Sequence, residues 1–558
     1  MFRKIVSLIN DPILRRWVYG FLIRKWDWKN PKSCRPDYIS NFTLDLLETN
    51  SSSFYEIKQF KKPEGKTKYN LAGETMNLEP ENFQKFSEKD FFDTESRQAF
   101  HRFAWLANSG LINEPEWTFL MWESWMEKYF DNSSIYAWHP YTTSERLTNL
   151  VMFADRYGFP AKHEKFHEFV LKHVKTLYEN LEYFGDLHTG NHLANNGKGL
   201  YLVGLYLEAD SWIEIGLTIL REESKRLFTI NGTLREGSIH YHLLVTKWYL
   251  ECWLASVKFN RKEQNDFFEI ITPMLFNAAN FNMPAGLPLI GDVSPDCTPE
   301  YLACLTSGSE TGWIASLKTY DRKLISGLFS KLKKRLKNKK PPFYRIDSSP
   351  WSAMVYVNNE GWQPLPGHGH NDFGVFEIHH NDERIFVDLG RRSYDKFGDI
   401  DKLADRHNVL CIDNSPAYPE NRAYYSNQFK RSIISKSPNW EVNDRSIKFE
   451  AECFPTIPEV KSWIREWDFS TDKVLLQDIV IGSGVHKIVR YLNTPKNCTL
   501  GKGEIICGSI RIKFSGSAEL RDIQYWKNYG ECERATNIKI SYDAQLPFQD
   551  TIEITSLA

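Results

Sequence analysis

The chain has 558 residues, of which 42% are hydrophobic and 25% are charged. This length exceeds what one hydrophobic core normally organises, so two or more domains are expected. The formal net charge is −1, which excludes a global positive field that would recruit nucleic acid or another polyanion. An acidic partner would have to meet a local basic site. No apolar run approaches membrane-spanning length, so no integral membrane segment is expected.

The first 28 residues, MFRKIVSLINDPILRRWVYGFLIRKWDW, are basic and partly apolar. Asn10, Asp11 and Pro12 interrupt them, and no small-residue cleavage site follows. These features indicate an amphipathic or packing segment, not a signal peptide. We expect residues 1–92 to be mostly helical and to pack on the next domain. A cytoplasmic location is favoured over a periplasmic one.

The nine cysteines are scattered from Cys34 to Cys532 without a CxxC pair. This distribution indicates neither a disulfide framework nor a cysteine-based metal site, and free thiols are expected.

Residues 93–340 show helical periodicity, with apolar side chains recurring every three or four positions. The basic stretch 331–340 is interpreted as the solvated end of the last helix, where cations suit the helix dipole. The pair Pro341–Pro342 then marks a domain boundary. Helices are expected at residues 117–129, 166–181, 200–207, 212–220, 242–259 and 321–337.

Residues 341–558 change to a period of two, for example at 447–451, 510–514 and 538–542. Short strands with one apolar and one polar face, separated by turns, favour antiparallel sheets packed as a sandwich. The sequence therefore predicts a long all-α domain followed by an all-β domain.

The stretch PGHGHNDFGVFEIHHNDERIFVDLG, residues 366–390, carries the strongest chemical signal. His368, His370 and Asp372 are spaced by two, so in an extended chain they share one face. Asp388 ends a predicted hairpin, with strands at 375–379 and 384–387, and His407 follows later. A two-residue turn at Asn381 would place Asp388 on the face opposite His370, so residues 368–372 must leave the sheet. Such residues suit a metal or acid–base site; the alternative is a set of polar loop residues.

This segment resembles the start of the β-domain in the heparinase II/III-like polysaccharide lyases, which show His-x-His-x-Asp, Asp-x-Gly and His-Asn in this order. Three stretches of the helical half also resemble the family. They are WHPYTTSER at 138–146, NHLANNGK at 191–198 and GTLREGSIHYH at 232–242. A Gly-Asp turn at Gly291–Asp292 is similar too. The resemblance implies an incomplete (α/α) toroid followed by an antiparallel β-sandwich, with the active site between them.

The resemblance also implies β-elimination on a uronic-acid-containing acidic polysaccharide. Asn191 would neutralise the substrate carboxylate, and His192 beside it would stabilise charge or act as base. Tyr241 would be the acid and a candidate base, and His368 is the other candidate base. A basic Tyr241 would need cationic neighbours to lower its pKa, and Arg235 and Arg146 are candidates.

His370, Asp388 and His407 match the family's metal ligands. Two imidazoles and a carboxylate suit one divalent ion, zinc first, with calcium or manganese as alternatives. The other residues expected to bind substrate are Trp138, Tyr141, Arg146, Arg235, Glu236, Arg391 and Arg392.

Two departures from the family leave the substrate open. Arg391–Arg392 replaces the common Gly-Thr, either as a surface turn or as a clamp for a carboxylate or sulfate. Asn195 and Asn196 replace an acidic residue near Asn-His. The competing functions are a hydrolase or other glycan-modifying enzyme in a polysaccharide-assembly pathway, and a non-catalytic glycan-binding protein with a structural metal.

Overall fold

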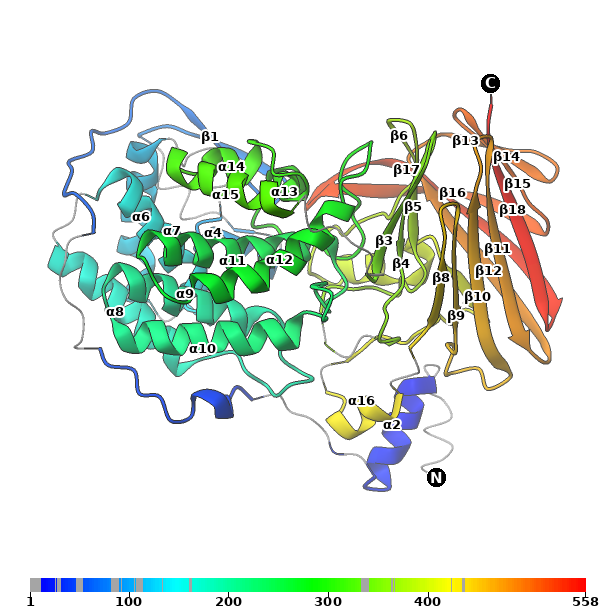
Figure 1. Cartoon of the computed structure of the whole chain (residues 1–558), viewed down its shortest axis with the longest axis horizontal. Coiled ribbons are helices and arrows are strands. Elements are labelled where there is room, and N and C mark those ends of the chain that lie inside the picture. Colours follow the sequence, from blue (N-terminus) through cyan, green and yellow to red (C-terminus); the bar gives the residue numbers. More distant parts are fainter. Residues whose placement is uncertain are drawn as a thin grey trace.

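A computed structural model of the chain describes residues 12–25, 27, 32–46, 54–81, 90–91, 93–104, 106, 114–132, 134–159, 163–332, 341–362, 365, 367–422, 424–433 and 437–557. Helices fill one half of the molecule and antiparallel sheets the other (Figure 1). The last described helix of the helical half ends at Leu332 and the first strand of the second half begins at Phe343. The predicted order of an (α/α) toroid followed by a β-sandwich is confirmed.

The helices of the first half form an aromatic-rich core, with Trp125, Trp212 and Trp248 almost completely buried. Their bounds are α4 Thr94–His101, α6 Pro115–Tyr129, α7 Pro140–Tyr157, α8 His163–Glu179, α9 His192–Tyr206, α10 Asp210–Leu227, α11 Ile239–Lys258, α12 Gln264–Asn280, α13 Pro299–Ala303, α14 Gly312–Ser316 and α15 Thr319–Leu332, with a 3₁₀ turn η3 at Cys304–Thr306. Every predicted helix lies on one of these, although residues 333–337 of the last lie outside the described residues.

Local signals explain where the helices that matter for the site begin. Pro140 occupies the first turn of α7, where its missing N–H costs no hydrogen bond. Ser238 caps α11, and its hydroxyl accepts a hydrogen bond from the backbone N–H of Tyr241. These two residues mark the starts of α7 and α11.

The second half contains an eight-stranded sheet, β13-β14-β15-β18-β11-β10-β9-β8, and a four-stranded sheet, β16-β17-β12-β7. Apolar side chains from both sheets pack into one core, among them Trp463 and Trp467 of β10 and Ile538 and Ile540 of β17. Another four-stranded sheet, β3-β4-β5-β6, lies towards the helices (Figure 1). There Phe343 of β3 meets Phe281, which follows α12, with ring centroids 5.6 Å apart.

The strands of these sheets are β3 Phe343–Ser348, β4 Trp351–Tyr356, β5 Phe376–His380, β6 Glu383–Phe386, β7 Leu410–Ile412, β8 Asn439–Val442, β9 Ser446–Ala451, β10 Val460–Phe469, β11 Lys473–Gly482, β12 Val485–Thr494, β13 Cys498–Leu500, β14 Glu504–Cys507, β15 Ile510–Lys513, β16 Ser517–Asn528, β17 Glu531–Gln545 and β18 Phe548–Ser556. The connections hold 3₁₀ turns η4 Gly398–Lys402 and η5 Ala404–Arg406 and the helix α16 Asn427–Ile433.

The hairpin of β5 and β6 differs from the predicted register. His379 pairs with Arg384, but Ile378 pairs with Phe386, so the ladder shifts by one residue between these two pairs. A one-residue shift turns the following side chains to the other face of a strand. The predicted hairpin lacked this shift, and it therefore placed the Asp388 side chain on the wrong face of the strand. Residues 368–372 lie outside the strands, as the sequence required.

The expectation for residues 1–92 needs correction. Their described part holds one α-helix, α2 Pro12–Leu22, a 3₁₀ turn η1 Asp37–Ile39 and a hairpin of β1 Thr67–Leu71 and β2 Glu74–Leu78. Helix α2 packs on the β half beside α16 (Figure 1), and Trp17 meets Tyr424 with ring centroids 5.1 Å apart. The later part of the segment does pack on the helical half, where Ile39, Tyr55 and Tyr69 join the core of the helices. The alternation of Tyr69 and Leu71, both buried, with the exposed Lys68 and Asn70 is strand-like.

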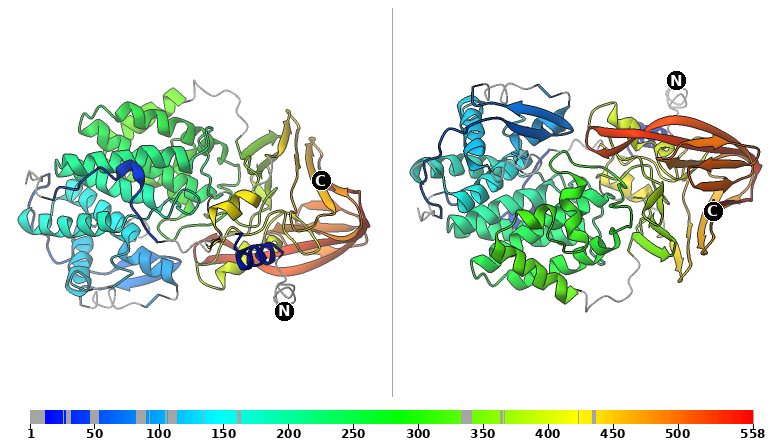
Figure 2. Two further views of the ribbon diagram at one scale, coloured as in Figure 1. Left: turned by 90° about the horizontal axis from the view of Figure 1, so that it is seen from below. Right: turned by 90° about the horizontal axis from the view of Figure 1, so that it is seen from above.

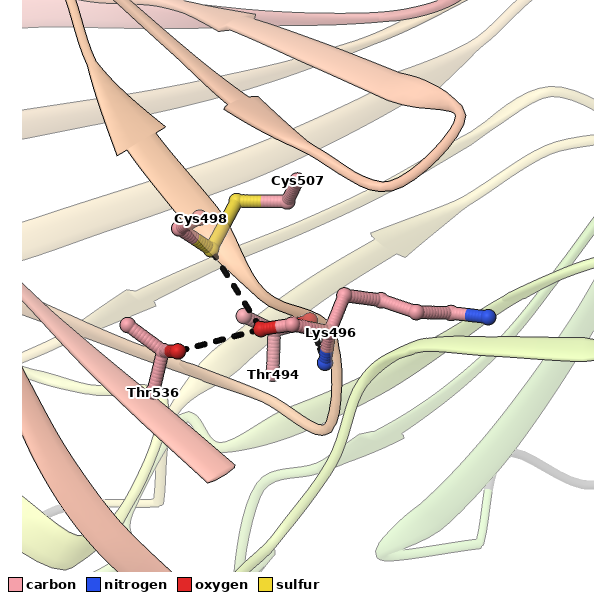
Figure 3. Close-up of a disulfide and its surroundings, with 5 residues drawn as sticks. All are labelled: Thr494, Lys496, Cys498, Cys507 and Thr536. Atoms are coloured by element: carbon pink, nitrogen blue, oxygen red, sulfur yellow. Dashed lines mark hydrogen bonds between the residues drawn. A yellow bond between two sulfur atoms is a disulfide. The ribbon is translucent and has the colours of Figure 1, made fainter. Parts of the chain in front are cut away.

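The expectation of free thiols is also corrected at one place. Cys498 of β13 and Cys507 of β14 are directly opposite each other and form a disulfide (Figure 3). Their sequence separation of nine gave no motif, because only the strand pairing brings them together. The other seven cysteines are free.

No helix among the described residues combines the length and the apolar character needed to cross a bilayer.

Candidate active site

Residues from both halves of the molecule meet at one point. Asn191 precedes α9, Tyr241 lies in the first turn of α11, and His368 lies in the loop before β5. The rings of Tyr241 and His368 stack, with centroids 3.4 Å apart and planes 10° apart. The Nδ2 atom of Asn191 lies 3.1 Å from Nε2 of His368. The site therefore exists only where the helical and β halves touch.

Glu236 holds Asn191 in place. Its carboxylate accepts hydrogen bonds from the backbone N–H and from Nδ2 of Asn191, both at 2.7 Å. Its backbone carbonyl accepts the N–H of His368 at 2.9 Å. Asn191 occupies the N-cap position of α9, but its side chain does not cap the helix. Its amide is therefore oriented towards His368 by Glu236.

Asp292 holds both histidines of the His-x-His motif. Its Oδ2 lies 3.0 Å from Nδ1 of His368, and its Oδ1 lies 2.7 Å from Nε2 of His370. Arg391 donates from Nη1 to both oxygens at 2.8 Å. Burial alone would raise the pKa of Asp292, but Arg391, Lys402 and the hydrogen bonds from the two histidines together outweigh it and hold this pKa well below its usual value. The sequence flagged the Gly291–Asp292 turn without giving Asp292 a role.

The turn before Asp292 requires glycine. Gly291 has φ +82°, and a Cβ atom there would lie 2.5 Å from the carbonyl oxygen of Gly237. Only glycine takes this conformation without strain while the backbone passes so close.

Tyr394 is a further residue of the site that sequence reasoning missed. Its hydroxyl lies 2.9 Å from the Tyr241 hydroxyl and 3.2 Å from Nδ1 of His368. The Arg391 guanidinium lies 3.9 Å from the centre of its ring. Nothing in the motif Arg-Arg-Ser-Tyr pointed to Tyr394, because its approach to α11 depends on how the two halves dock.

Burial raises the pKa of Tyr241 well above its usual value. The two arginines expected to lower it lie elsewhere. Arg146 is fully buried and donates to His173 and to the carbonyls of His101 and Ala137, and Arg235 pairs with Glu360 at 3.1 Å. Tyr241 is therefore a neutral hydroxyl bonded to Tyr394.

His192 is oriented by Glu182, whose Oε1 lies 2.7 Å from Nδ1 of the ring. Burial lowers the pKa of His192, but Glu182 more than offsets this, and the net shift is upward. The ring packs on Tyr141 with centroids 4.7 Å apart. Glu182 also accepts from Nδ2 of Asn196 at 3.3 Å. An acidic residue thus stands near the Asn-His pair after all, supplied from ten positions earlier.

His370, Asp388 and His407 converge on one point of the β half. One potential ligand atom from each lies within 4.8 Å of the others. Among the described residues, Nδ1 of His370 and Nε2 of His407 are buried and have no hydrogen-bond partner. The other ring nitrogen of each histidine faces a carboxylate, Asp292 for His370 and Asp388 for His407. Histidine ligands commonly have such a carboxylate on the far nitrogen, so these residues fit a divalent ion.

The residues expected to bind substrate differ in how deeply they are buried and in what they contact. Glu236 and Arg391 are buried and hold Asn191 and Asp292, and Tyr141 is buried against His192. Trp138 is half-buried and its indole N–H donates to the carbonyl of Tyr129. Arg392 is half-buried, and its Nη2 donates to Gln524 at 3.2 Å.

Complete burial of Arg146 argues against its direct contact with substrate, whereas contact by Arg235 stays a prediction. The Arg146 guanidinium lies inside the helical half, 4.2 Å from the ring centre of Trp125. The Arg235 guanidinium donates hydrogen bonds to Glu360 at 3.1 Å and to the carbonyl of Arg226 at 2.6 Å. Among the described residues, neither guanidinium has hydrogen bonds to the groups around His368.

The sequence matches two family profiles, "Heparinase II/III N-terminus" over residues 52–304 and "Heparinase II/III-like, C-terminal" over residues 341–535. A search of curated proteins finds no match.

Solved structures share the fold. "Crystal Structure of Heparinase III" is 15% identical with a TM-score of 0.61, covering 98% of this chain and 92% of that chain. The heparan sulfate lyase HepC from Pedobacter heparinus is 14% identical with a TM-score of 0.51, covering 98% and 88%. "Heparinase III-BT4657 gene product" is 17% identical with a TM-score of 0.55, covering 84% and 80%. The motifs, the two matched profiles and the shared fold agree, and the chain belongs to the heparinase II/III-like family of polysaccharide lyases.

Proposed function

We propose that the chain is a polysaccharide lyase that cleaves a uronic-acid-containing acidic polysaccharide by β-elimination. The observation that carries this proposal is the meeting of Asn191, Tyr241 and His368 at the contact of the two halves, with Asp292 and Glu236 orienting them. Elimination needs a group that binds the carboxylate, a base for the C5 proton and an acid for the departing oxygen. This cluster offers a candidate for each role.

We assign the base to His368. Its Nδ1 faces Asp292, so an Nδ1–H donated to that carboxylate leaves the lone pair on Nε2. This is the arrangement by which a carboxylate orients a basic imidazole. A substrate that displaces Asn191 from Nε2 would meet an unprotonated nitrogen there.

Tyr241 is assigned as the acid. Because burial raises its pKa, the hydroxyl keeps its proton at neutral pH and can donate it to the glycosidic oxygen. Tyr394, bonded to the Tyr241 hydroxyl and close to His368, would stabilise the oxygen that remains.

Asn191 and His192 bind the uronate. The amide of Asn191 has one N–H on Glu236 and the other towards His368, and a substrate carboxylate would replace His368 as the second acceptor. His192, whose pKa is raised by Glu182, would supply positive charge next to it. This favours charge stabilisation over a base role for His192.

A divalent ion held by His370, Asp388 and His407, zinc first and calcium or manganese as alternatives, would supply fixed positive charge and rigidity near the site. The chain itself transmits that rigidity, since Asp292 joins His370 to His368.

The hydrolase alternative needs two carboxyl groups available to a glycosidic bond. Glu236 and Asp292 are the carboxylates nearest His368, and both are fully engaged, one with Asn191 and one with Arg391 and two histidines. The site therefore suits elimination better than hydrolysis.

The test is a panel of acidic polysaccharides, each incubated with the purified full chain. Elimination produces an unsaturated uronate that absorbs ultraviolet light, whereas hydrolysis releases reducing ends without that absorbance. New reducing ends with no absorbance would replace the lyase assignment by the hydrolase. Heparan sulfate belongs in the panel because related structures are heparan sulfate lyases.

A further inference from the structure

Helix α2 attaches to the β half by one face only. Trp17 is 3% exposed and packs on Tyr424 and Tyr425, with ring centroids 5.1 and 5.9 Å away. Gly20, one turn later, is also buried. Residues spaced by three share a helix face, so this face is the attachment side. Figure 2 shows α2 lying across the outside of the β half, next to α16.

The other side of α2 and the residues just after it are apolar and exposed. Tyr19, Leu22 and Ile23 are 38%, 43% and 55% exposed. Phe21, one turn after Trp17, stacks on the Trp17 ring with centroids 5.4 Å apart and belongs to the attachment side. Elsewhere in the described residues, large exposed apolar side chains are scattered, apart from a group near the candidate active site at Phe397, Ile400 and Leu403. Three such side chains close together and away from the site mark an interaction surface.

Basic residues border this apolar run on both sides. Arg16 precedes it, and Arg24 and Lys25 follow it, all exposed. No acidic residue occurs in the described stretch 12–25. The chain as a whole has a net charge of −1, so this density of positive charge is local. Apolar side chains flanked by arginine and lysine are the chemistry of a helix that lies in the interface of an anionic lipid bilayer.

We propose that α2 and its continuation to Lys25 form a docking surface for an anionic membrane. Tyr19, Leu22 and Ile23 enter the boundary between headgroups and acyl chains, and Arg16, Arg24 and Lys25 bind lipid phosphates. Trp17 anchors the helix to the β half, so binding of α2 holds the enzyme at the membrane surface. This surface is separate from the catalytic cluster, and the proposal stands without any assumption about the polysaccharide.

The experiment is co-sedimentation of the full chain with vesicles. Vesicles of equal parts phosphatidylcholine and phosphatidylglycerol are compared with vesicles of phosphatidylcholine alone, at low and high salt. The wild-type chain sediments with the anionic vesicles, and salt weakens this binding. Failure to sediment with anionic vesicles at low salt overturns the proposal.

Two double variants separate the two parts of the surface. Leu22→Ser with Ile23→Ser removes apolar contact and lowers partitioning at least about tenfold. Arg16→Gln with Arg24→Gln removes two cations and lowers it roughly 25-fold at low salt, since each juxtamembrane cation contributes about fivefold. Both variants keep the wild-type circular dichroism and melting temperature because the changed side chains are exposed.

Val485→Ser is the matched control, since Val485 is 71% exposed at the start of β12, remote from α2 in sequence. It sediments like the wild type. Equal sedimentation of all variants and the wild type excludes α2 as the binding element. A wild-type dimer that becomes a monomer in the Leu22→Ser, Ile23→Ser variant, measured by light scattering, assigns the surface to self-association and also overturns the proposal.

Discussion

The Tyr241 ring stacks on His368, and its buried hydroxyl is hydrogen-bonded to the hydroxyl of Tyr394. Tyr241→Phe removes only this oxygen. We expect turnover to fall by a factor on the order of 10²–10⁴ while substrate binding and folding remain. Single-turnover rates and binding titrations on a substrate from the panel measure this.

Tyr249→Phe is the control, because Tyr249 lies on the same helix and its hydroxyl donates to the carbonyl of Leu220 at 2.8 Å, inside the core. It should lose some stability and keep its rate. A Tyr241→Phe enzyme with more than about half of the wild-type rate would remove Tyr241 from the acid role.

Arg391 and Arg392 are adjacent in sequence but should behave differently. Arg391 is buried on Asp292, so Arg391→Ala leaves a buried carboxylate without its cation, at a cost of about 3–5 kcal/mol. We expect lower thermal stability and a lower kcat, because Asp292 orients His368. Denaturant unfolding and steady-state kinetics test this.

Arg392 is half-buried, so Arg392→Ala should mainly raise KM and weaken the dependence of KM on salt. Kinetics across a salt series distinguish the two residues. Identical behaviour of the two variants would contradict this division of roles.

At the residue scale, the sequence predicted the groups that belong to motifs: Asn191, Tyr241, His368 and the three candidate metal ligands lie close together as expected. Tyr394 and Glu182 were missed. Each reaches the site through packing between segments far apart in the chain, and local patterns carry no information about such approaches. Arg146 shows the opposite case: it belongs to a motif, but its side chain is buried in the core of the helical half.

The loop that carries His368 and His370 is tied to Asp292 through both histidines. His370→Ala should lose one equivalent of divalent metal, detected by elemental analysis of the purified chain, and should lower the melting temperature. Activity should fall as well, because Asp292 then holds His368 without its second histidine.

His380→Ala is a suitable control for the metal measurement, since His380 lies at the end of β5 and packs against Trp351 with ring centroids 4.5 Å apart. It should retain the wild-type metal content. Wild-type protein free of metal and unaffected by chelators would remove the ion from the proposal.

Helix α16 contributes a pH-dependent link between the halves. Lys430 is fully buried, and its Nζ donates to the carbonyl of Leu187, four residues before Asn191, at 2.9 Å. Burial lowers the pKa of Lys430 to about 7. The unfolded chain keeps this proton to about pH 10, whereas the folded chain releases it near 7, so this residue makes stability rise with pH between these values.

Lys430→Met removes the titration. We expect the unfolding free energy of the wild type, relative to that of the variant, to increase with pH. The increase is up to about 1.4 kcal/mol per pH unit between pH 7 and 9. Denaturant unfolding of both proteins across this range measures the difference. A difference independent of pH would mean that Lys430 stays protonated in the folded chain.

At the element scale, helical periodicity predicted the helices well because their buried faces repeat over several turns. The hairpin at β5 and β6 was predicted with the wrong register, since a bulge depends on the neighbouring strand and leaves no mark in the alternation. The placement of α2 was wrong for a related reason. An amphipathic helix identifies its buried face but not the domain against which that face packs.

For the whole molecule, the order of a helical half and a β half followed from the change of period at Pro341, but the docking of the halves did not. One link spans 436 positions of sequence: the Tyr529 hydroxyl, after β16, donates to Asp93, the N-cap of α4, at 2.8 Å. The same oxygen accepts the backbone N–H of Tyr394 at 3.0 Å. Tyr529 thus ties the docking of the halves to the position of Tyr394.

Tyr529→Phe tests this link. The half-buried N–H of Tyr394 loses its acceptor, which should cost about 1–3 kcal/mol of unfolding free energy. The rate on substrate should fall as well, because Tyr394 positions the hydroxyl of Tyr241. Tyr178→Phe is the matched control: its hydroxyl donates to the carbonyl of Phe42 at 3.0 Å, away from the β half, so any loss should be in stability alone. If both variants lose stability and neither loses rate, the Tyr529 hydroxyl holds the halves together without setting the catalytic geometry.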